Sequence, residues 1–333
     1  MKLRKLIFYT FVLVSLLLSM SLFSISIGGS ESGIKIELGR VLSFLLGHAD
    51  EIDKIIILQI RFPRILTSIF AGGGLAVAGA ILQAIIRNPL AEPYILGISS
   101  GSAFGAVVSI ALIGSFSFAF TPILALAGSL LVTILVYFLG KRRGVIDINT
   151  MLLSGIMTGA FFSALILIII TISNESLKNV LFWLLGNLSS VNLKQSILIC
   201  IVVLISFVLT FIHSYRLNLL AMGEEIAKQL GIDAEFTKRA SYFVASVLTA
   251  VIVSITGVIG FIGLVVPHVC RKIFSVDYRI LIPTSFFAGG ITLLLADTIV
   301  RVILYPNELP VGSITALFGA PFFVYLLKKE KSS

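Results

Sequence analysis

The sequence predicts an all-α polytopic membrane protein with about ten transmembrane helices, some of them short or broken, and with both termini in the cytoplasm. The 333 residues are 58% hydrophobic and only 12% charged, whereas soluble domains contain about 25% charged residues. Apolar segments of about 20 residues, the length that crosses a bilayer as a helix, recur along the whole chain. Because the connections are short, we expect a single transmembrane domain over residues 1–333.

The apolar segments are separated by short polar connections. The first follows Lys2, Arg4 and Lys5 and is longer than the hydrophobic region of an ordinary signal peptide, so we interpret it as a retained span. The eighth is too short to cross a bilayer about 30 Å thick at 1.5 Å per residue, and we expect a half-helix or the continuation of a neighbour. The segments are residues 6–27, 62–86, 94–112, 117–139, 150–172, 194–213, 240–257, 259–270, 280–300 and 311–327.

Positive charges are distributed unevenly between the connections. With the N-terminus inside and alternate connections on opposite sides, about two thirds of the 25 Lys and Arg residues fall on the inner side. Cytoplasmic loops of membrane proteins are enriched in Lys and Arg, so this distribution predicts both termini in the cytoplasm and an even number of spans. The net charge of +9 therefore reflects membrane topology and does not indicate nucleic-acid binding.

Two connections on the predicted outer side are long enough to contain structure of their own. Residues 34–53 are expected to form a short surface helix followed by an acidic patch at 50–53. Residues 173–192 include the only tryptophan, Trp183. Because tryptophan favours the membrane interface, we expect a re-entrant or interfacial helix there.

Small residues are concentrated in the second and third apolar segments. Gly72, Ala76, Ala80 and Ala84 recur every four residues, and 97–105 repeats the same composition. Small residues at this spacing allow helices in lipid to approach closely. The pattern therefore predicts tight packing, with the lining of a pathway or a dimer seam as the functional alternative.

Motifs for catalysis and cofactor binding are absent from the sequence. The phosphate loop GxxxxGK[ST] is missing, because GKRRG at 140–144 lacks its spacing, and no HExxH, CxxC or nucleophile-elbow motif occurs. His48, His213 and His268 lie in separate segments, and Cys200 and Cys270 lack metal-ligand spacing. We therefore expect no catalytic residue, metal or cofactor on this chain, which argues against a membrane enzyme.

One acidic residue lies in an apolar segment near its outer end. Asp297 is followed four residues later by Arg301, and this spacing predicts a local ion pair on one helix face. Ion-coupled carriers use chains of acidic residues and histidines near the membrane midplane, and no such chain is present. An ion-coupled secondary transporter is therefore the less favoured alternative.

Two arginines flank Pro63 at the outer end of the second segment. Arg61 and Arg64 are expected either to extend their side chains to the membrane interface or to bind acidic side chains of an extracytoplasmic partner. Guanidinium groups match carboxylates in a bidentate geometry, which favours the second role for a docking site. Arg301, also on the outer side, can join them.

The most unusual connection is Tyr215–Arg239, referred to below as the 215–239 segment. It places acidic and basic residues among several leucines and isoleucines, and the charge distribution puts it in the cytoplasm. A connection between two spans needs neither this length nor this amphipathic pattern. The segment is therefore expected to dock onto a soluble partner, with a solvated interfacial loop as the alternative.

Local signals divide the 215–239 segment into two short helices. Gly223 separates the two pieces, Glu224 and Lys228 are spaced to pair, and Gly231 suits the position after a helix C-terminus. The expected helices are Leu217–Met222 and Glu224–Leu230.

Several motifs spread over the chain together resemble the FecCD family, from about residue 6 to residue 328. They are RFPR at 61–64, RNPLAEP at 87–93, LGISSG at 96–101, GFIGLVVPH at 260–268, Ala296 and Asp297 with Arg301, LPVG at 309–312 and GAP at 319–321. Glu92 stands where aspartate is commoner in that family, which keeps the charge. The family comprises permease subunits of ABC importers for iron–siderophores, haem and vitamin B12.

The resemblance implies an assembly as well as a fold. Such permeases have ten spans and pair as a homodimer or a close heterodimer, with the pathway at the seam, so the small residues of the second, third and fifth segments would line it. Two cytoplasmic ATPase subunits carry ATP and Mg²⁺, and an extracytoplasmic binding protein delivers the ligand. The chain would be a multi-pass protein of the cell membrane that carries a ferric siderophore, with vitamin B12 or haem as the alternative cargo.

The resemblance also assigns residues to the two docking surfaces. The binding protein would dock at Arg61, Arg64 and Arg301. The ATPase would be coupled through residues of the 215–239 segment, namely Leu217, Leu220, Gly223, Glu224, Ile226, Leu230 and Gly231.

Overall fold

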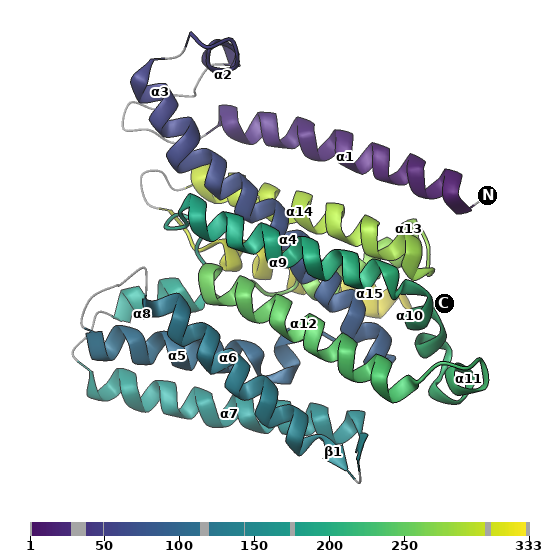
Figure 1. The fold of residues 1–333 in the computed structure, drawn as a ribbon. Coiled ribbons are helices and arrows are strands. Elements are labelled where there is room, and N and C mark those ends of the chain that lie inside the picture. Colours follow the sequence, from purple (N-terminus) through teal and green to yellow (C-terminus); the bar gives the residue numbers. More distant parts are fainter. Residues whose placement is uncertain are drawn as a thin grey trace.

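The computed structural model describes residues 2–27, 38–48, 50–113, 120–142, 144–173, 177–303 and 308–330. Over these residues the chain forms a bundle of helices with one small hairpin of two-residue strands (Figure 1). The all-α fold class predicted from the composition is confirmed.

The longer helices are α1 (Lys2–Ser26), α4 (Phe62–Ile86), α5 (Ile98–Ile113), α6 (Phe120–Leu139), α7 (Ile148–Ile172), α9 (Leu193–Ile212), α12 (Ala234–Thr256), α14 (Tyr278–Ile303) and α15 (Val311–Glu330). The shorter elements are α2 (Leu38–Leu45), α3 (Glu51–Ile55), the π-helix η1 (Ile56–Arg61), the 3-10 helix η2 (Pro93–Leu96), β1 (Lys141–Arg142), β2 (Val145–Ile146), α8 (Leu177–Leu184), α10 (Ser214–Met222), α11 (Glu224–Gln229) and α13 (Ile262–Ile273).

The helices reproduce the predicted apolar segments. Within the described residues, 7 helices are long and apolar enough to cross a membrane, and α5 and α15 are apolar but shorter. The eighth predicted segment corresponds to α13, which has 12 residues and contains Pro267. Each predicted segment overlaps one of these helices, and the expectation that the eighth does not cross alone agrees with the length of α13.

The connection before α4 contains the predicted short helix, and the acidic part that follows it is helical as well. Residues 34–37 lie outside the described part of the chain, α2 is a short helix, and from Glu51 onward α3, η1 and α4 form one continuous helix. The ring of Pro63 would collide with the carbonyl one turn earlier, and the wider π turn before it relieves that contact. The predicted acidic patch is divided, because Asp53 is buried while Glu51 is exposed.

Helix α4 runs through the centre of the bundle (Figure 1). It is buried along almost its whole length and contacts α9, α12, α13 and α14. A methyl group at Gly72 would collide with the backbone carbonyl of Gly289 in α14, and one at Gly79 with that of Gly263 in α13. The small residues of α4 therefore allow backbone-to-backbone contact, which confirms the packing interpretation for this helix.

A second group of helices, α5, α6 and α7, packs beside α12 with the short helix α8. A helix in the connection 173–192 was predicted, and α8 confirms it. Its Trp183 is buried in an apolar cluster with residues of α5, α7 and α12, such as Ala106, Ile166 and Val253. The tryptophan therefore holds the connection against the bundle.

The two ends of the bundle carry different elements. The first turn of α1, the last turn of α15 and the helices α10 and α11 lie at one end, and α2, α3 and α8 lie at the other (Figure 1). Both described chain ends therefore share a side with the 215–239 segment, as an even number of crossings requires. That this side is cytoplasmic remains a prediction from the charges.

Close packing of α4 leads to a test of fold stability. Gly72→Ala should lower the free energy of unfolding by about 1–3 kcal/mol, because the added methyl group has no space against α14. Gly159→Ala in α7 is the matched control, because its methyl group would meet only Ser100 Oγ at 3.7 Å. Thermal unfolding in detergent measures both variants, and equal midpoints would contradict the assigned contact.

Candidate functional site

The 215–239 segment folds into two short helices and the start of a long one. Gly223, between α10 and α11, has φ 139° and ψ 148°, a conformation that favours glycine. Gly231 has φ 80° and follows Leu230, the C-cap of α11. The predicted division at Gly223 and the role of Gly231 are confirmed, although α10 begins at Ser214, before the expected start.

The inner side of the segment packs against the bundle. Leu217 and Leu220 in α10 are each 1% exposed, and α10 contacts α4 and α14. Gly223 is buried as well. These predicted coupling residues are therefore buried within the chain and hold α10 in place.

A buried lysine fixes the segment to the neighbouring hairpin. Lys238, 1% exposed, donates to Glu224 Oε2 at 3.1 Å and to the carbonyl of Ile146 at 3.2 Å, and it also pairs with Glu235. Glu235 in turn accepts the backbone N–H of Ile146 at 3.1 Å. Because ions attract more strongly away from water, this cluster holds α11, α12 and β2 together.

The predicted pairing of Glu224 with Lys228 is wrong. Lys228 lies 3.5 Å from Glu225 on the exposed face, and Glu224 turns inward to Lys238. A carboxylate gains more from a lysine that burial has removed from water than from an exposed lysine whose charge is screened.

The outer side of the segment exposes an apolar row. Met222, Ile226 and Leu230 are 65%, 38% and 56% exposed and follow one another at intervals of four residues. Glu225, Lys228 and Gln229, all exposed, surround them. We call Met222, Ile226 and Leu230 the docking row. The sequence prediction included the last two and missed Met222, which ends α10 and is separated from them by the break at Gly223.

A buried group of charged residues lies at the opposite end of α4 and α14. Arg64 Nε donates to Asp297 Oδ1 at 2.7 Å, and its Nη1 lies 2.9 and 2.8 Å from the two carboxylate oxygens of Glu308. Arg301 Nε lies 3.3 Å from Asp297 Oδ2, which confirms the predicted local pair. We call Arg61, Arg64, Asp297, Arg301 and Glu308 the outer ion network.

Further contacts of Arg301 and Arg61 bind this network to the end of α1. Arg301 Nη1 donates to the carbonyls of Ser24 and Ile27, both at 3.3 Å, and Arg61 Nη1 donates to the carbonyl of Ile25. Because these carbonyls end α1, the arginines supply donors that the helix itself lacks.

The structure brings the three predicted docking arginines together, but it buries them. Arg61, Arg64 and Arg301 are 5%, 5% and 6% exposed. Of the two acidic residues that pair with Arg64, Asp297 has a fully buried side chain, whereas the side chain of Glu308 is 36% exposed. Any partner that approaches this end therefore meets Glu308 before it meets a guanidinium group.

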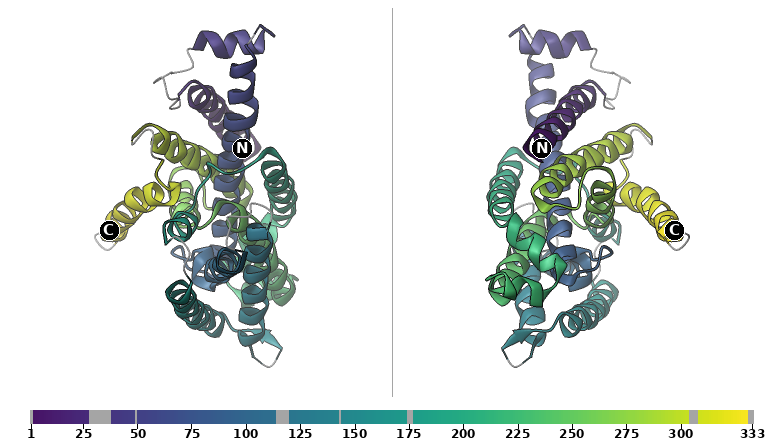
Figure 2. Two further views of the ribbon diagram at one scale, coloured as in Figure 1. Left: turned by 90° about the vertical axis from the view of Figure 1, so that its left-hand side faces the viewer. Right: turned by 90° about the vertical axis from the view of Figure 1, so that its right-hand side faces the viewer.

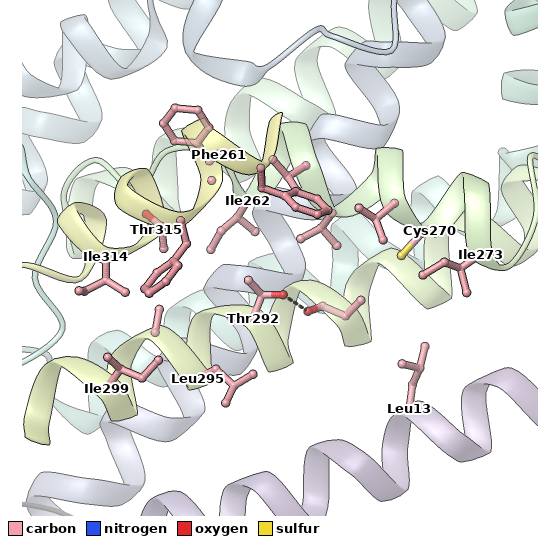
Figure 3. Close-up of a pocket in the computed structure, with 18 of the residues that line it drawn as sticks. Leu13, Phe261, Ile262, Cys270, Ile273, Thr292, Leu295, Ile299, Ile314 and Thr315 are labelled. Carbon is pink, nitrogen blue, oxygen red and sulfur yellow. Dashed lines mark hydrogen bonds between the residues drawn. The ribbon is translucent and has the colours of Figure 1, made fainter. Parts of the chain in front are cut away.

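An apolar pocket of about 500 Å³ lies between α1, α13, α14 and α15 (Figure 3). Leu13, Phe261, Cys270 and Ile299 are among its lining residues, and Thr292 donates its hydroxyl to the carbonyl of Ala288 within it. The pocket offers no charged group to a polar ligand. Among the described residues no group of three or more His, Cys, Asp or Glu side chains is placed to hold a metal ion.

Comparisons with known proteins identify relatives over almost the whole chain. Residues 13–329 match the model of the FecCD transport family. The chain is 39% identical to the cobalamin import system permease protein BtuC of Halobacterium salinarum, over 84% of this chain and 75% of the relative. It is 37% identical to the Fe(3+)-citrate import system permease protein YfmE of Bacillus subtilis, over 96% and 94%. A solved structure of a metal-chelate type ABC transporter in an inward-facing conformation aligns with a TM-score of 0.84 at 32% identity, over 96% and 98%.

The buried lysine cluster predicts a local loss of stability. Lys238→Met should destabilise the 215–239 segment by about 3 kcal/mol, because Glu224 and Glu235 lose their shared cation. Hydrogen exchange of the segment in the detergent-solubilised protein measures the effect. Lys228→Met, on the exposed face of the same segment, should leave exchange unchanged. Equal acceleration in both variants would refute the anchoring role.

Proposed function

The chain belongs to the FecCD transport family, and we propose that it is the permease of a binding-protein-dependent ABC importer for a ferric siderophore. It is a multi-pass cell-membrane subunit of a transporter and not an enzyme. In this proposal residues 1–333 form one transmembrane permease domain, and the 215–239 segment is its cytoplasmic coupling part. The observation that carries the proposal is the docking row, an exposed apolar surface within a charged connection of the chain.

Energy would enter through the docking row. The chain lacks a phosphate loop, so ATP and Mg²⁺ would be bound by two partner ATPase subunits and no cofactor by this chain. Exposed apolar residues ringed by polar ones are typical of protein interfaces. Nucleotide binding would move the ATPase subunits, and α10 and α11 would move with them, since a ligand changes a conformation only by favouring one state over another.

A second permease copy, or a close relative, would complete the assembly. Helix α15 extends away from the rest of the bundle and, among the described elements, its main contacts are to α13 and α14 (Figure 2). Helix α7 exposes large apolar side chains along its length, such as Leu153, Phe161 and Leu167. A second copy would cover part of this apolar surface, and lipid would cover the rest.

The cargo is proposed from the named functions of the relatives. Relatives with 37% and 36% identity are named for Fe(3+)-citrate and iron(3+)-hydroxamate import. A relative with 39% identity is named for cobalamin import, so vitamin B12 is an equally supported alternative, and haem is a further one. We prefer a ferric siderophore because iron–siderophore import is the broadest use of the family.

An ion-coupled secondary transporter is less well supported. Its coupling site would need an acidic residue able to bind and release a cation within the membrane. Asp297 is 0% exposed and is already paired with both Arg64 and Arg301. Two permanent cations at this carboxylate would exclude a third. Transport in vesicles without the ATPase would favour the secondary transporter over the ABC importer.

The extracytoplasmic binding protein is proposed to dock over the outer ion network. The buried arginines do not form the contact surface themselves, and a charge reversal at Arg64 would place a third acidic group beside Asp297 and Glu308. The partly exposed Glu308 occupies the outward side of Arg64. A carboxylate of the binding protein would compete with Glu308 for that guanidinium group.

The docking row can be tested with paired substitutions. Ile226→Asp and Leu230→Asp should each weaken ATPase binding by about 30-fold, corresponding to about 2 kcal/mol at a central interface residue. Binding is measured by co-purification of the ATPase subunits and by bio-layer interferometry. Ile52→Asp, an exposed isoleucine at the opposite end, is the control and should bind normally. Normal ATPase binding by both docking-row variants would show that the 215–239 segment is not the ATPase-binding surface.

The proposed competition at Arg64 predicts a gain of affinity. Glu308→Gln should strengthen docking of the binding protein by about fivefold, and more at low salt, because Arg64 is then left with excess positive charge. Glu51→Gln, an exposed acid at the same end, should change docking little. Affinity is measured across a salt series, and identical values for the two variants would contradict docking at this network.

A further inference from the structure

A chain of hydrogen bonds runs from α10 into the centre of the bundle. Asn218 in α10 binds the side chain of Asp277 and the backbone N–H of the adjacent Tyr278, and the Tyr278 hydroxyl is linked through Arg271 to Gln83 in α4. We call these five residues the relay. None of them belongs to the docking row or to the outer ion network.

The first step of the relay clamps α10 to the start of α14. Asn218 Nδ2 donates to Asp277 Oδ1 at 2.7 Å, and Asn218 Oδ1 accepts the backbone N–H of Tyr278 at 2.9 Å. The guanidinium carbon of Arg279 also lies 5.4 Å from the centre of the Tyr215 ring. Because both functional groups of the Asn218 amide are used, α10 cannot shift without moving the turn between α13 and α14.

The second step joins this turn to α13 and α4. Arg271 Nη2 donates to the hydroxyl of Tyr278 at 3.1 Å, and its guanidinium carbon lies 5.7 Å from the centre of that ring. Arg271 Nη1 donates to the side-chain oxygen of Gln83. Arg271 stands in the last turn of α13, so the relay enters that helix at its end.

The third step reaches the beginning of α13. Gln83, 3% exposed, directs its Nε2 toward the carbonyls of Ala91, Gly263 and Leu264 at 3.3, 3.5 and 3.3 Å. Within a helix the Gly263 carbonyl would accept from residue 267, but that residue is Pro267 and has no N–H. Gln83 supplies the missing donor. Its amide therefore binds both ends of α13, the first turn directly and the last turn through Arg271.

The chain just before α13 is held in a strained conformation. Phe261 has φ 69°, which is uncommon for a residue with a side chain, and its N–H donates to Glu92 Oε1 at 2.9 Å. The hydroxyl of Tyr94 accepts the N–H of Ile259 at 3.1 Å and donates to the carbonyl of the same residue. These contacts fix residues 257–261 to the connection after α4. Phe261 also lines the apolar pocket of Figure 3.

We propose that the relay transmits displacement of α10 to α13, with Gln83 and Arg271 as its positioning residues. The proposal rests on the proposed function only in taking α10 as the element that the ATPase moves. Apolar contacts such as those of Leu217 can slide, whereas directional hydrogen bonds among buried groups hold a fixed register. When α10 moves with the start of α14, Arg271 and Gln83 draw α13 along, and the strained residue Phe261 is where the chain yields.

Cys270 provides a reporter of α13 within the native sequence. It is 1% exposed, precedes Arg271 and lines the apolar pocket (Figure 3). In a Cys200→Ser background it becomes the single thiol of the chain. The complex with its ATPase subunits is reconstituted in vesicles, and the rate of Cys270 modification by N-ethylmaleimide is measured without nucleotide and with ADP–vanadate. No cargo or binding protein is needed.

The relay predicts that the ratio of the two rates is about fivefold in the parent protein and close to one in Gln83→Leu. Tyr278→Phe removes only the hydroxyl that binds Arg271, and it should reduce the ratio in the same direction without loss of the fold. Thr67→Val is the matched control, because it removes a buried hydrogen bond to Ser196 from the other half of α4. This control should keep the parental ratio.

The outcomes separate the relay from the proposed function. A merely structural role for Gln83 would change both rates equally and preserve their ratio, which would overturn the relay. If Tyr278→Phe and Gln83→Leu bind the ATPase and keep the parent protein's ratio of modification rates, the relay is also overturned. If the ATPase fails to co-purify with the parent protein, the proposed role of the 215–239 segment is wrong, and the relay loses its moving element. A ratio of modification rates that falls toward one in both variants, with the ATPase still bound, would support the relay.

Discussion

The backbone contact between α4 and α14 at Gly72 and Gly289 is the constraint on which the rest of the structure depends. Away from water, helices associate through close packing and through polar groups that find partners inside the protein. This contact sets how α4 lies along α14. It therefore fixes the polar system that these two helices share, the pairing of Arg64 with Asp297, while Gln83 near the other end of α4 is bonded to α13.

The two ends of the molecule use different physics for recognition. The end with the 215–239 segment buries its ions, such as Lys238, and exposes an apolar row. The other end buries apolar and charged groups together and leaves the partly exposed Glu308 at its surface. A partner at the first end would be held by desolvated apolar contacts, which slow dissociation, whereas a partner at the second end would be attracted by charge and would respond to salt.

The sequence was sufficient for features that depend on neighbours along the chain. Spans follow from long apolar runs, the pair of Asp297 and Arg301 from a spacing of one turn, and the division of the 215–239 segment from Gly223. Features that depend on distant segments were missed. The pairing of Glu224 with Lys238 depends on how α11 lies against α12, and local spacing pointed instead to Lys228.

The same limit applies to the outer ion network and the relay. Arg64 and Glu308 are separated by 244 positions, and Gln83 and Arg271 by 188. No periodic pattern connects residues at such separations, so the sequence predicted where the arginines lie along the chain but not that they are buried. Burial changes their physical role, because a guanidinium group that holds Asp297 and Glu308 stabilises the chain before it binds anything else.

The short helix α13 explains why polar side chains gather in the interior of this protein. A helix of 12 residues that contains Pro267 and follows an irregular stretch has several backbone groups without intrahelical partners. In the hydrocarbon region each such group left unpaired would cost several kcal/mol. Glu92, Tyr94 and Gln83 provide these partners, and all three come from the end of α4 and the connection that follows it. A movement that separated α13 from this connection would break all of these bonds at once. Glu92 and Tyr94 thus hold the residues just before α13 to this connection, and Gln83 holds the first turn of α13 to the end of α4.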